Sequence, residues 1–205
     1  MGMNLKIGSM GLLLGLCVLL AGVVGHASAP ETKIKWFGHS AFSITTTNGK
    51  VLLIDPWLRN PSNPDAKDGK DPLALIPELT IFSLRMDTAT TWAGFVIAIR
   101  NGPTIYHSGD TAYFKDMETI GEIYSIDVAL INIGGHFGME PKMAARAALS
   151  VRAKLAVPHH FGTFPGIVEN ADGFSVELKR LKIPFYEMKP GETISFRGKQ
   201  LAQRN

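Results

Sequence analysis

The stretch TIYHSGDT, at residues 104–111, decides the fold class of this chain. Its first residues are β-prone, and Gly109 and Asp110 follow where a strand would end. Glycine lets the backbone turn tightly at that point, so that the Asp110 carboxylate can point at a bound cation. Open α/β sheets collect their ligands at such strand ends. The stretch therefore predicts one strand of an α/β sheet with a metal-capable carboxylate behind it.

Two later stretches repeat this arrangement with histidine. NIGGHF, at residues 132–137, and VPHHFGTFP, at residues 157–165, each place an imidazole just after an apolar strand. Carboxylate and neutral imidazole are usual zinc ligands, and a catalytic zinc keeps one position open for water. A single such strand end is more often a turn, a helix cap or a surface histidine. Three of them in order favour a metal site.

The residues before this region predict a β-rich opening. Strand-like runs occupy residues 34–37, 41–47 and 51–54. Asn48-Gly49, between the last two runs, is a strong hairpin signal. Asp55-Pro56 follows the third run, and we interpret Asp55 as a turn former rather than as a ligand.

The rest of the chain alternates between strands and helices. The pattern predicts strands over 94–100, 103–107, 127–133, 155–157, 182–185 and 194–196, and helices near 114–124, 144–151 and 172–181. Residues 60–72 are typical of a polar surface loop, and the stretch 73–91 fits either a short helix or strands. A β-rich start followed by alternating elements indicates one α/β domain, residues 30–205, with a sheet core covered by helices.

Residues 1–29 carry a signal-peptide pattern. Lys6 is the only charge in this segment, and its apolar run 11–25 is shorter than the ~20 residues of a membrane-spanning helix. The small residues Ala27 and Ala29 suit a signal peptidase, which predicts an exported protein, periplasmic or secreted. A retained anchor and a buried N-terminal helix are the alternatives, and the lack of an amphipathic stripe disfavours the buried helix.

Charge and cysteine content exclude several classes of function. The whole chain has a net charge of +3, and removal of the signal segment would take away one positive charge and leave no basic run. A nucleic-acid partner is therefore not expected. The sole cysteine, Cys17, lies in the signal segment, so the mature chain would have neither a disulfide nor a cysteine nucleophile. The expected partner is a small-molecule substrate, with no membrane contact beyond the signal segment and the oligomeric state left open.

Six motifs, taken in order, resemble one family. They are WFGHSAF (36–42), IDPW (54–57), AGFV (93–96), YHSGDT (106–111), GGHF (134–137) and HFGTFP (160–165). The series spans nearly everything from residue 33 to 196 and is similar to the metal-dependent hydrolases related to ascorbate-6-phosphate lactonase. The resemblance implies the four-layer αββα sandwich of the metallo-β-lactamase fold. It also implies hydrolysis of an ester, lactone or phosphodiester bond with two zinc ions.

The resemblance implies metal ligands at two positions. In that family the aspartate of the Gly-Asp-Thr motif bridges two metal ions, and this aspartate corresponds to Asp110. The histidine before the aromatic-Gly-Thr motif binds one of the ions, and this histidine corresponds to His160. His107 is either a third metal ligand or a neighbour of the site.

The other histidines match positions without a metal role. His39 and His136 correspond to residues near the site, and we assign them to catalysis through substrate contact or support of the ligands. His159 stands where the family has a residue that does not bind metal. Such neighbours matter because they fix the tautomer and direction of a liganding imidazole.

One part of the family pattern is missing. The signature His-x-His-x-Asp-His is expected between Trp57 and Ala93, yet no histidine occurs from residue 40 to 106. The chain is also short there, as if a block had been deleted and its flanks joined within residues 73–91. Asp110 and His160 alone are too few ligands for a metal pair, so we expect one zinc ion or none. The predicted fold is accordingly a sandwich truncated in its N-terminal half.

Three hypotheses follow from this half of a metal site. The chain is a metal-dependent hydrolase, a non-catalytic exported scaffold or binding protein descended from one, or an incomplete version of an intact enzyme. The coding DNA across residues 70–92 tests the third hypothesis, because an in-frame zinc motif there would reveal a missing segment. The substrate is not determined by the sequence.

Overall fold

The computed structural model describes residues 29–67, 83–84 and 94–205. The predicted signal segment, up to residue 28, and most of the ambiguous stretch 73–91 lie outside the described residues. Within the described part, no helix is both long enough and apolar enough to cross a membrane.

The first of two sheets has six strands in the order β10-β9-β1-β2-β3-β4. Their bounds are Glu31–Gly38 (β1), Ala41–Thr45 (β2), Val51–Ile54 (β3), Ser83–Leu84 (β4), Thr193–Arg197 (β9) and Gln200–Arg204 (β10). Neighbouring strands are antiparallel except β3 and β4, which run parallel. The predicted hairpin joins β2 and β3, and Gly49 adopts the left-handed backbone that its turn requires, with φ of 82°.

The second sheet has four strands in the order β5-β6-β7-β8. They are Phe95–Ala98 (β5), Thr104–His107 (β6), Val128–Asn132 (β7) and Ala156–His159 (β8). The last three run parallel, and every residue of β7 is buried. Parallel strands covered on both faces favour continuous apolar runs of this kind. The carboxyl ends of β6, β7 and β8 therefore meet at one edge of the sheet.

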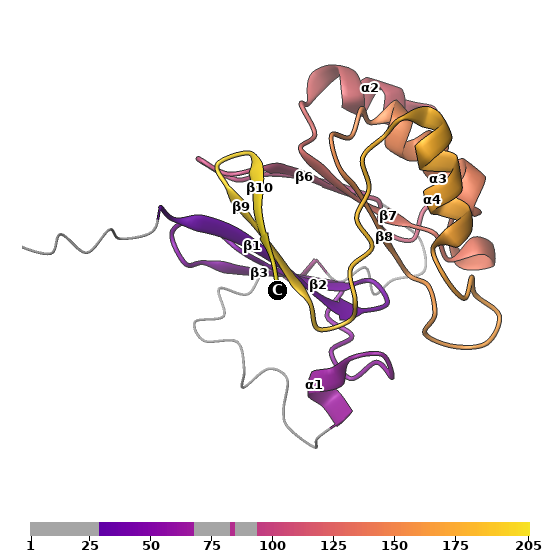
Figure 1. Cartoon of the computed structure of the whole chain (residues 1–205), viewed down its shortest axis with the longest axis horizontal. Helices are drawn as coiled ribbons and strands as arrows, with labels where there is room; N and C mark the ends of the chain where they lie inside the picture. Colours follow the sequence, from indigo (N-terminus) through magenta and orange to yellow (C-terminus); the bar gives the residue numbers. More distant parts are fainter. Residues whose placement is uncertain (1–28, 68–82, 85–93) are drawn as a thin grey trace, which may run out of the picture.

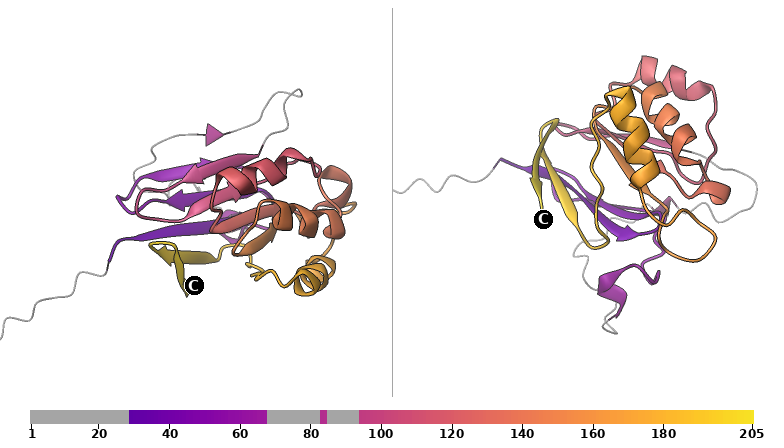
Figure 2. Two further views of the ribbon diagram at one scale, coloured as in Figure 1. Left: turned by 90° about the horizontal axis from the view of Figure 1, so that it is seen from above. Right: turned by 45° about the vertical axis from the view of Figure 1, so that its right-hand side comes forward.

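Three helices cover the outer face of the second sheet (Figure 1). They are α2 (Asp116–Ile123), α3 (Pro141–Ser150) and α4 (Asp172–Leu181). The alanines on the buried stripe of α3, such as Ala144 and Ala148, let the helix lie close to the sheet and to α4. Figure 2 shows the first sheet on the side of the second sheet that the helices leave uncovered.

The protein is thus an α/β molecule built in layers, as predicted. Apart from the single-turn helix α1 (Pro64–Lys67), the described residues supply three layers of an αββα sandwich, in the order sheet, sheet and helices. The core between the sheets includes Trp36, Phe42, Leu130 and Val157, all at most 1% exposed. Burial of such side chains is the main favourable term in folding.

The secondary structure departs from the sequence-based prediction at two places. Residues 182–185 form no strand, because Lys182 closes α4 in a left-handed conformation and Pro184 has no N–H to donate to a ladder. Only an isolated bridge between Ala156 and Phe185 remains there. Strand β10 was not expected, and its exposed, polar sequence QLAQR lacks the alternation that signals a strand.

Candidate active site

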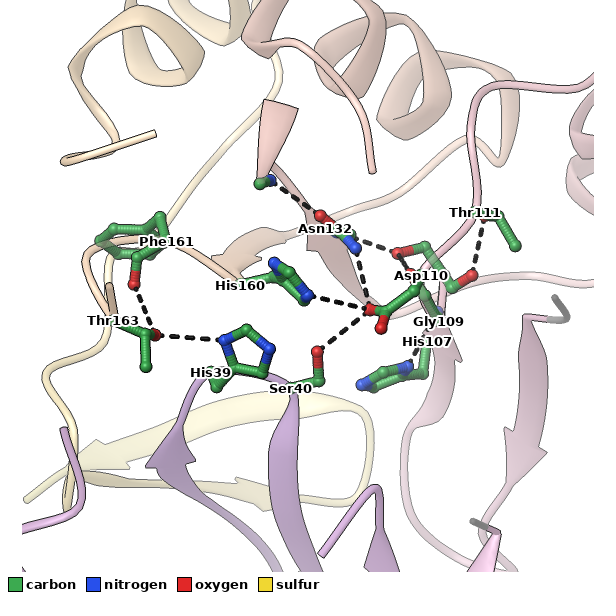
Figure 3. Close-up of polar contacts among 12 residues, drawn as sticks. His39, Ser40, His107, Gly109, Asp110, Thr111, Asn132, His160, Phe161 and Thr163 are labelled. Atoms are coloured by element: carbon green, nitrogen blue, oxygen red, sulfur yellow. Dashed lines mark hydrogen bonds and ion pairs between the residues drawn. The ribbon is translucent and has the colours of Figure 1, made fainter. Parts of the chain in front are cut away.

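Asp110 lies just beyond the end of β6, and three side chains converge on one of its oxygens. Ser40 Oγ donates a hydrogen bond to Asp110 Oδ1 at 3.2 Å, and Asn132 Nδ2 donates to the same atom at 3.0 Å. His160 Nε2 lies 3.5 Å from it. Figure 3 shows these contacts meeting at Oδ1. The carboxylate is therefore held in one orientation from both sheets.

The same contacts keep Asp110 ionised. Partial burial by itself raises the pKa of a carboxyl group. For Asp110 the hydrogen bond and the charge of His160, together with the hydrogen bond from Ser40, outweigh burial and hold the pKa below its usual value. The site therefore presents a negative charge at neutral pH.

Asn132 is a positioning residue that the sequence did not single out. It ends β7 and is fully buried, and its Oδ1 accepts a hydrogen bond from the Gly134 N–H at 2.8 Å. A Cβ at Gly138 would stand 2.1 Å from Asn132 Oδ1, so only glycine leaves room for this amide. The sequence feature that could have pointed to Asn132 is an asparagine at a strand end, directly before a glycine-rich loop.

His160 follows β8 in a left-handed backbone conformation, with φ of 64°. Its N–H donates to the His39 carbonyl at 3.0 Å, and the two imidazole rings lie with their centroids 3.8 Å apart. Its Nδ1 is buried and has no hydrogen-bond partner among the described residues. A Cβ at Gly134 would lie 2.4 Å from that nitrogen, so this glycine makes space for the ring.

His39 enters the site from the turn between β1 and β2, and a hydrogen bond with Thr163 holds its ring. Thr163 Oγ1 lies 3.2 Å from His39 Nδ1 and 3.3 Å from the Phe161 carbonyl oxygen. The tautomer of the ring decides whether Nδ1 or the hydroxyl group is the donor. Burial, reinforced by the charge of His160, lowers the pKa of His39 to about 4. The imidazole is therefore neutral at neutral pH.

His107 and His159 lie in the core behind this site. Their rings stack with centroids 4.6 Å apart, and the ring of Phe42 meets each of them edge-on. His107 Nδ1 accepts a hydrogen bond from the Gly109 N–H at 3.0 Å, so it supports the turn that carries Asp110. Burial lowers the pKa of His107 to about 4 and that of His159 well below its usual value. A metal role for His107 stays a prediction.

A pocket of about 740 Å³ opens over the site. Asp110 and His160 lie in its wall together with His39 and His136, so four of the predicted site residues share one cavity. His136 is exposed and sits on the short helix η2 (Gly135–Phe137). His107 and His159 do not line it.

The donor chemistry of Asp110 and His160 suits one zinc ion. Zinc holds nitrogen and oxygen ligands at about 2.0–2.2 Å in a tetrahedron, which sets two ligand atoms roughly 3.3 Å apart. The 3.5 Å between Asp110 Oδ1 and His160 Nε2 is close to that separation. Among residues 29–67, 83–84 and 94–205, no third His, Cys, Asp or Glu completes a metal-binding cluster. The described residues therefore fit part of a single-ion site.

Comparison with known proteins places these features in context. Residues 65–161 match the family model described as a Beta-lactamase superfamily domain. A UPF0173 metal-dependent hydrolase of Thermodesulfovibrio yellowstonii is 31% identical over 86% of this chain and 97% of its own. A second, from Pyrobaculum aerophilum, is 34% identical over 79% of this chain and 99% of its own. That alignment runs over 224 positions, more than the 205 residues present here, so part of the relative has no counterpart in this chain.

The fold has a counterpart among solved structures. Igni18, described as a novel metallo hydrolase of the archaeon Ignicoccus hospitalis, superposes with a TM-score of 0.63 and is 26% identical. The match covers 81% of this chain and 98% of that one. The two-sheet arrangement described above is thus shared with a metallo hydrolase.

Proposed function

We propose that this chain uses one zinc ion to hydrolyse an ester, lactone or phosphodiester bond. It belongs to the UPF0173 family of metal-dependent hydrolases in the metallo-β-lactamase superfamily. The observation that carries the proposal is the pairing of Asp110 and His160 at ligand spacing in the wall of a large pocket. Aspartate oxygen and histidine nitrogen are common zinc ligands, which is why we name zinc.

Asp110 and His160 would bind the ion, and neighbouring side chains fix the positions of these two ligands. Ser40 and Asn132 keep the carboxylate in place, while the His39 ring lies against His160. A divalent ion bound there supplies Lewis acidity and lowers the pKa of water. The neutral ring of His39 has a lone pair on one nitrogen, and when Nδ1 carries the proton, Nε2 can accept a hydrogen bond from the attacking water.

The reaction consumes one water molecule. For an ester or lactone, the water oxygen bonds to the carbonyl carbon, the C–O bond to the alcohol breaks, and the departing alkoxide takes up the proton that the water has lost. His136, exposed in the pocket wall, is the residue that we assign to contact with the leaving group. A neutral His39 acts here as an acceptor and orienting group rather than as an acid.

A second candidate function is that of a non-catalytic binding protein. Two observations favour it: the described residues contribute only two metal ligands, and His160 Nδ1 lacks an acceptor among them. In zinc sites that nitrogen normally donates to a carboxylate or carbonyl, which raises the basicity of the ligand. Metal content and turnover distinguish the two functions.

The test compares Asp110→Asn with the matched variant Asp116→Asn, whose carboxylate is exposed at the start of α2. We expect wild type and Asp116→Asn to carry close to one zinc per chain by plasma mass spectrometry and to hydrolyse 4-nitrophenyl esters or aromatic lactones. Asp110→Asn should bind zinc at least about tenfold more weakly and lose turnover. Wild-type protein that purifies without zinc, and shows no hydrolysis that Asp110→Asn abolishes, would support the binding protein instead.

A further inference from the structure

A second hollow lies on the helical layer and is separate from the pocket over Asp110. It has a volume of about 330 Å³, and side chains of α2, α3 and α4 line it. Figure 1 shows these three helices side by side on the outer face of the second sheet. The hollow and the pocket over Asp110 share no lining residue. Its volume is at the lower end of the range for small-molecule sites, so it suits a small ligand.

Apolar side chains remain exposed in this hollow. Helix α3 buries a stripe of alanines, and larger residues stand outside that stripe. Two of them, Met143 and Leu149, are 38% and 49% exposed, and both line the hollow together with Leu181 of α4. Exposed apolar groups that gather in a concave surface with a polar rim are typical of a binding site.

The carboxylates that line the hollow have partners within the protein. Glu177 Oε2 accepts a hydrogen bond from Arg180 at 2.6 Å. Glu118 lies 3.6 Å from Lys115 Nζ, and it accepts a hydrogen bond from the Tyr113 hydroxyl at 3.3 Å. These contacts offset both negative charges of the lining.

Two cations of the lining, Lys142 and Arg146, have no carboxylate partner among the described residues. They are four residues apart on α3, so they lie on one face of the helix. The Arg146 guanidinium lies over the Tyr113 ring, 5.2 Å from its centroid, and this contact orients it. A guanidinium can bind a carboxylate through two parallel hydrogen bonds. The hollow therefore combines an apolar surface with positive charge that the protein leaves uncompensated.

We propose that this hollow binds a small amphipathic carboxylate, such as a medium-chain fatty acid. Its carboxylate would pair with Lys142 and Arg146, and its hydrocarbon chain would cover Met143 and Leu149. The site is independent of the metal ion and of the reaction proposed above, because none of its residues belongs to the pocket over Asp110.

Three probes separate the contributions of charge and apolar surface: octanoate, the neutral octanamide, and acetate. Calorimetry measures the affinities, and the NMR signal of the Met143 methyl group, assigned through Met143→Leu, reports where the probe binds. Octanoate should shift this signal and bind about tenfold or more tightly than either of the other probes. Equal affinities for octanoate and octanamide, or a Met143 signal that octanoate does not shift, would overturn the proposal.

Exposed charges supply matched variants. Arg146→Gln should weaken octanoate binding about fivefold to twentyfold. Arg152→Gln removes an exposed guanidinium just beyond α3, outside the hollow, and should leave the affinity unchanged. Glu177→Gln releases Arg180 from its ion pair and should tighten octanoate binding about twofold to fivefold. Affinity that falls or stays the same in Glu177→Gln contradicts the charge argument.

Two other outcomes would assign binding elsewhere and defeat the proposal. If Phe164→Ala, in the wall of the pocket over Asp110, abolishes octanoate binding and Arg146→Gln does not, the ligand occupies the candidate active site. If the Met143 signal ignores octanoate, while Arg146→Gln abolishes sedimentation with phosphatidylglycerol vesicles, the hollow faces an anionic membrane instead of a free carboxylate.

Discussion

At the scale of single residues, the site depends on how one carboxylate is held. Asp110 receives hydrogen bonds from Ser40, in the turn between β1 and β2, and from Asn132, at the end of β7, and both reach Oδ1. Hydrogen bonds to an ionised acceptor are stronger than those between neutral groups, and they fix geometry. The position of the predicted metal ligand is therefore a property of its neighbours as much as of Asp110 itself.

Replacing Asn132 with alanine tests this dependence. Asn132→Ala removes the hydrogen bond to Asp110 and leaves the Gly134 N–H without its acceptor. We expect zinc affinity to fall about tenfold to a hundredfold, with a loss of roughly 1–3 kcal/mol in the free energy of unfolding. Competition with a chromophoric chelator and urea denaturation measure the two effects.

Asn60 provides the matched control for this prediction. It is also a buried asparagine, and its Nδ2 donates to the Phe37 and Trp57 carbonyls. Asn60→Ala should lower stability by a similar amount while zinc affinity stays near that of wild type. Equal zinc affinities in the two variants would mean that Asn132 has only a structural role.

At the scale of elements, glycines set how closely the helices pack. Gly121 lies on the buried side of α2, where a Cβ would stand 2.3 Å from the Ser150 carbonyl oxygen and 2.8 Å from the Val151 backbone. These are backbone atoms at the end of α3, so they cannot turn aside as a flexible side chain can. The contact between α2 and α3 therefore requires glycine at this position.

Substitution of helix glycines by alanine separates packing from helix propensity. Gly121→Ala should lower the free energy of unfolding by about 1–3 kcal/mol, because α2 must move away from α3. Gly173→Ala, in the first turn of α4, meets only the Pro141 ring at 3.3 Å and gains up to about 1 kcal/mol of helix propensity. It should be close to neutral by thermal denaturation. If Gly173→Ala lowered the free energy of unfolding as much as Gly121→Ala does, helix propensity and local contacts would not explain the effects of these substitutions.

At the scale of the whole molecule, the two sheets enclose imidazoles that folding keeps neutral. Burial lowers the pKa of His39 and His107 to about 4 and lowers that of His159 well below its ordinary value. In the unfolded chain each titrates near 6.5. The unfolded state therefore binds more protons between these values, and stability declines as pH falls through this window.

The contribution of one such histidine is measurable. For His107, titration does not change the free energy of unfolding above pH 6.5. As pH falls toward 4, it lowers the free energy of unfolding by at most about 3 kcal/mol. His107→Phe keeps an aromatic ring beside His159 and removes the titration. Urea denaturation of chelator-treated protein at pH 7.0 and 4.5 should therefore show a smaller loss of stability in this variant than in wild type. Equal losses would mean that His107 is not held neutral by burial.

Much of the fold could be predicted because its signals are local. The Asn48-Gly49 turn, the apolar run of β7 and the periodic pattern of α4 each lie within one stretch of sequence, and all three elements formed as expected. Residues 182–185 form no strand because Lys182 closes α4 in a left-handed conformation and Pro184 lacks an N–H group. Strand β10 was missed because it forms by pairing with its neighbour β9, while its own mostly exposed sequence lacks the alternation of a half-buried strand.

The amino-acid sequence by itself determined the order of the elements, the strand-end positions of Asp110, His136 and His160, and the resemblance that led to the hydrolase family. Only the tertiary structure decided which residues meet. It brought Ser40 and Asn132 onto one oxygen of Asp110, placed the tilted rings of His39 and His160 with their centroids 3.8 Å apart, and left His107 and His159 in the core. These pairs are separated by 20 to more than 100 residues, and their contacts arise because two sheets pack face to face and parallel strands end at one edge. No local pattern in the chain carries that information.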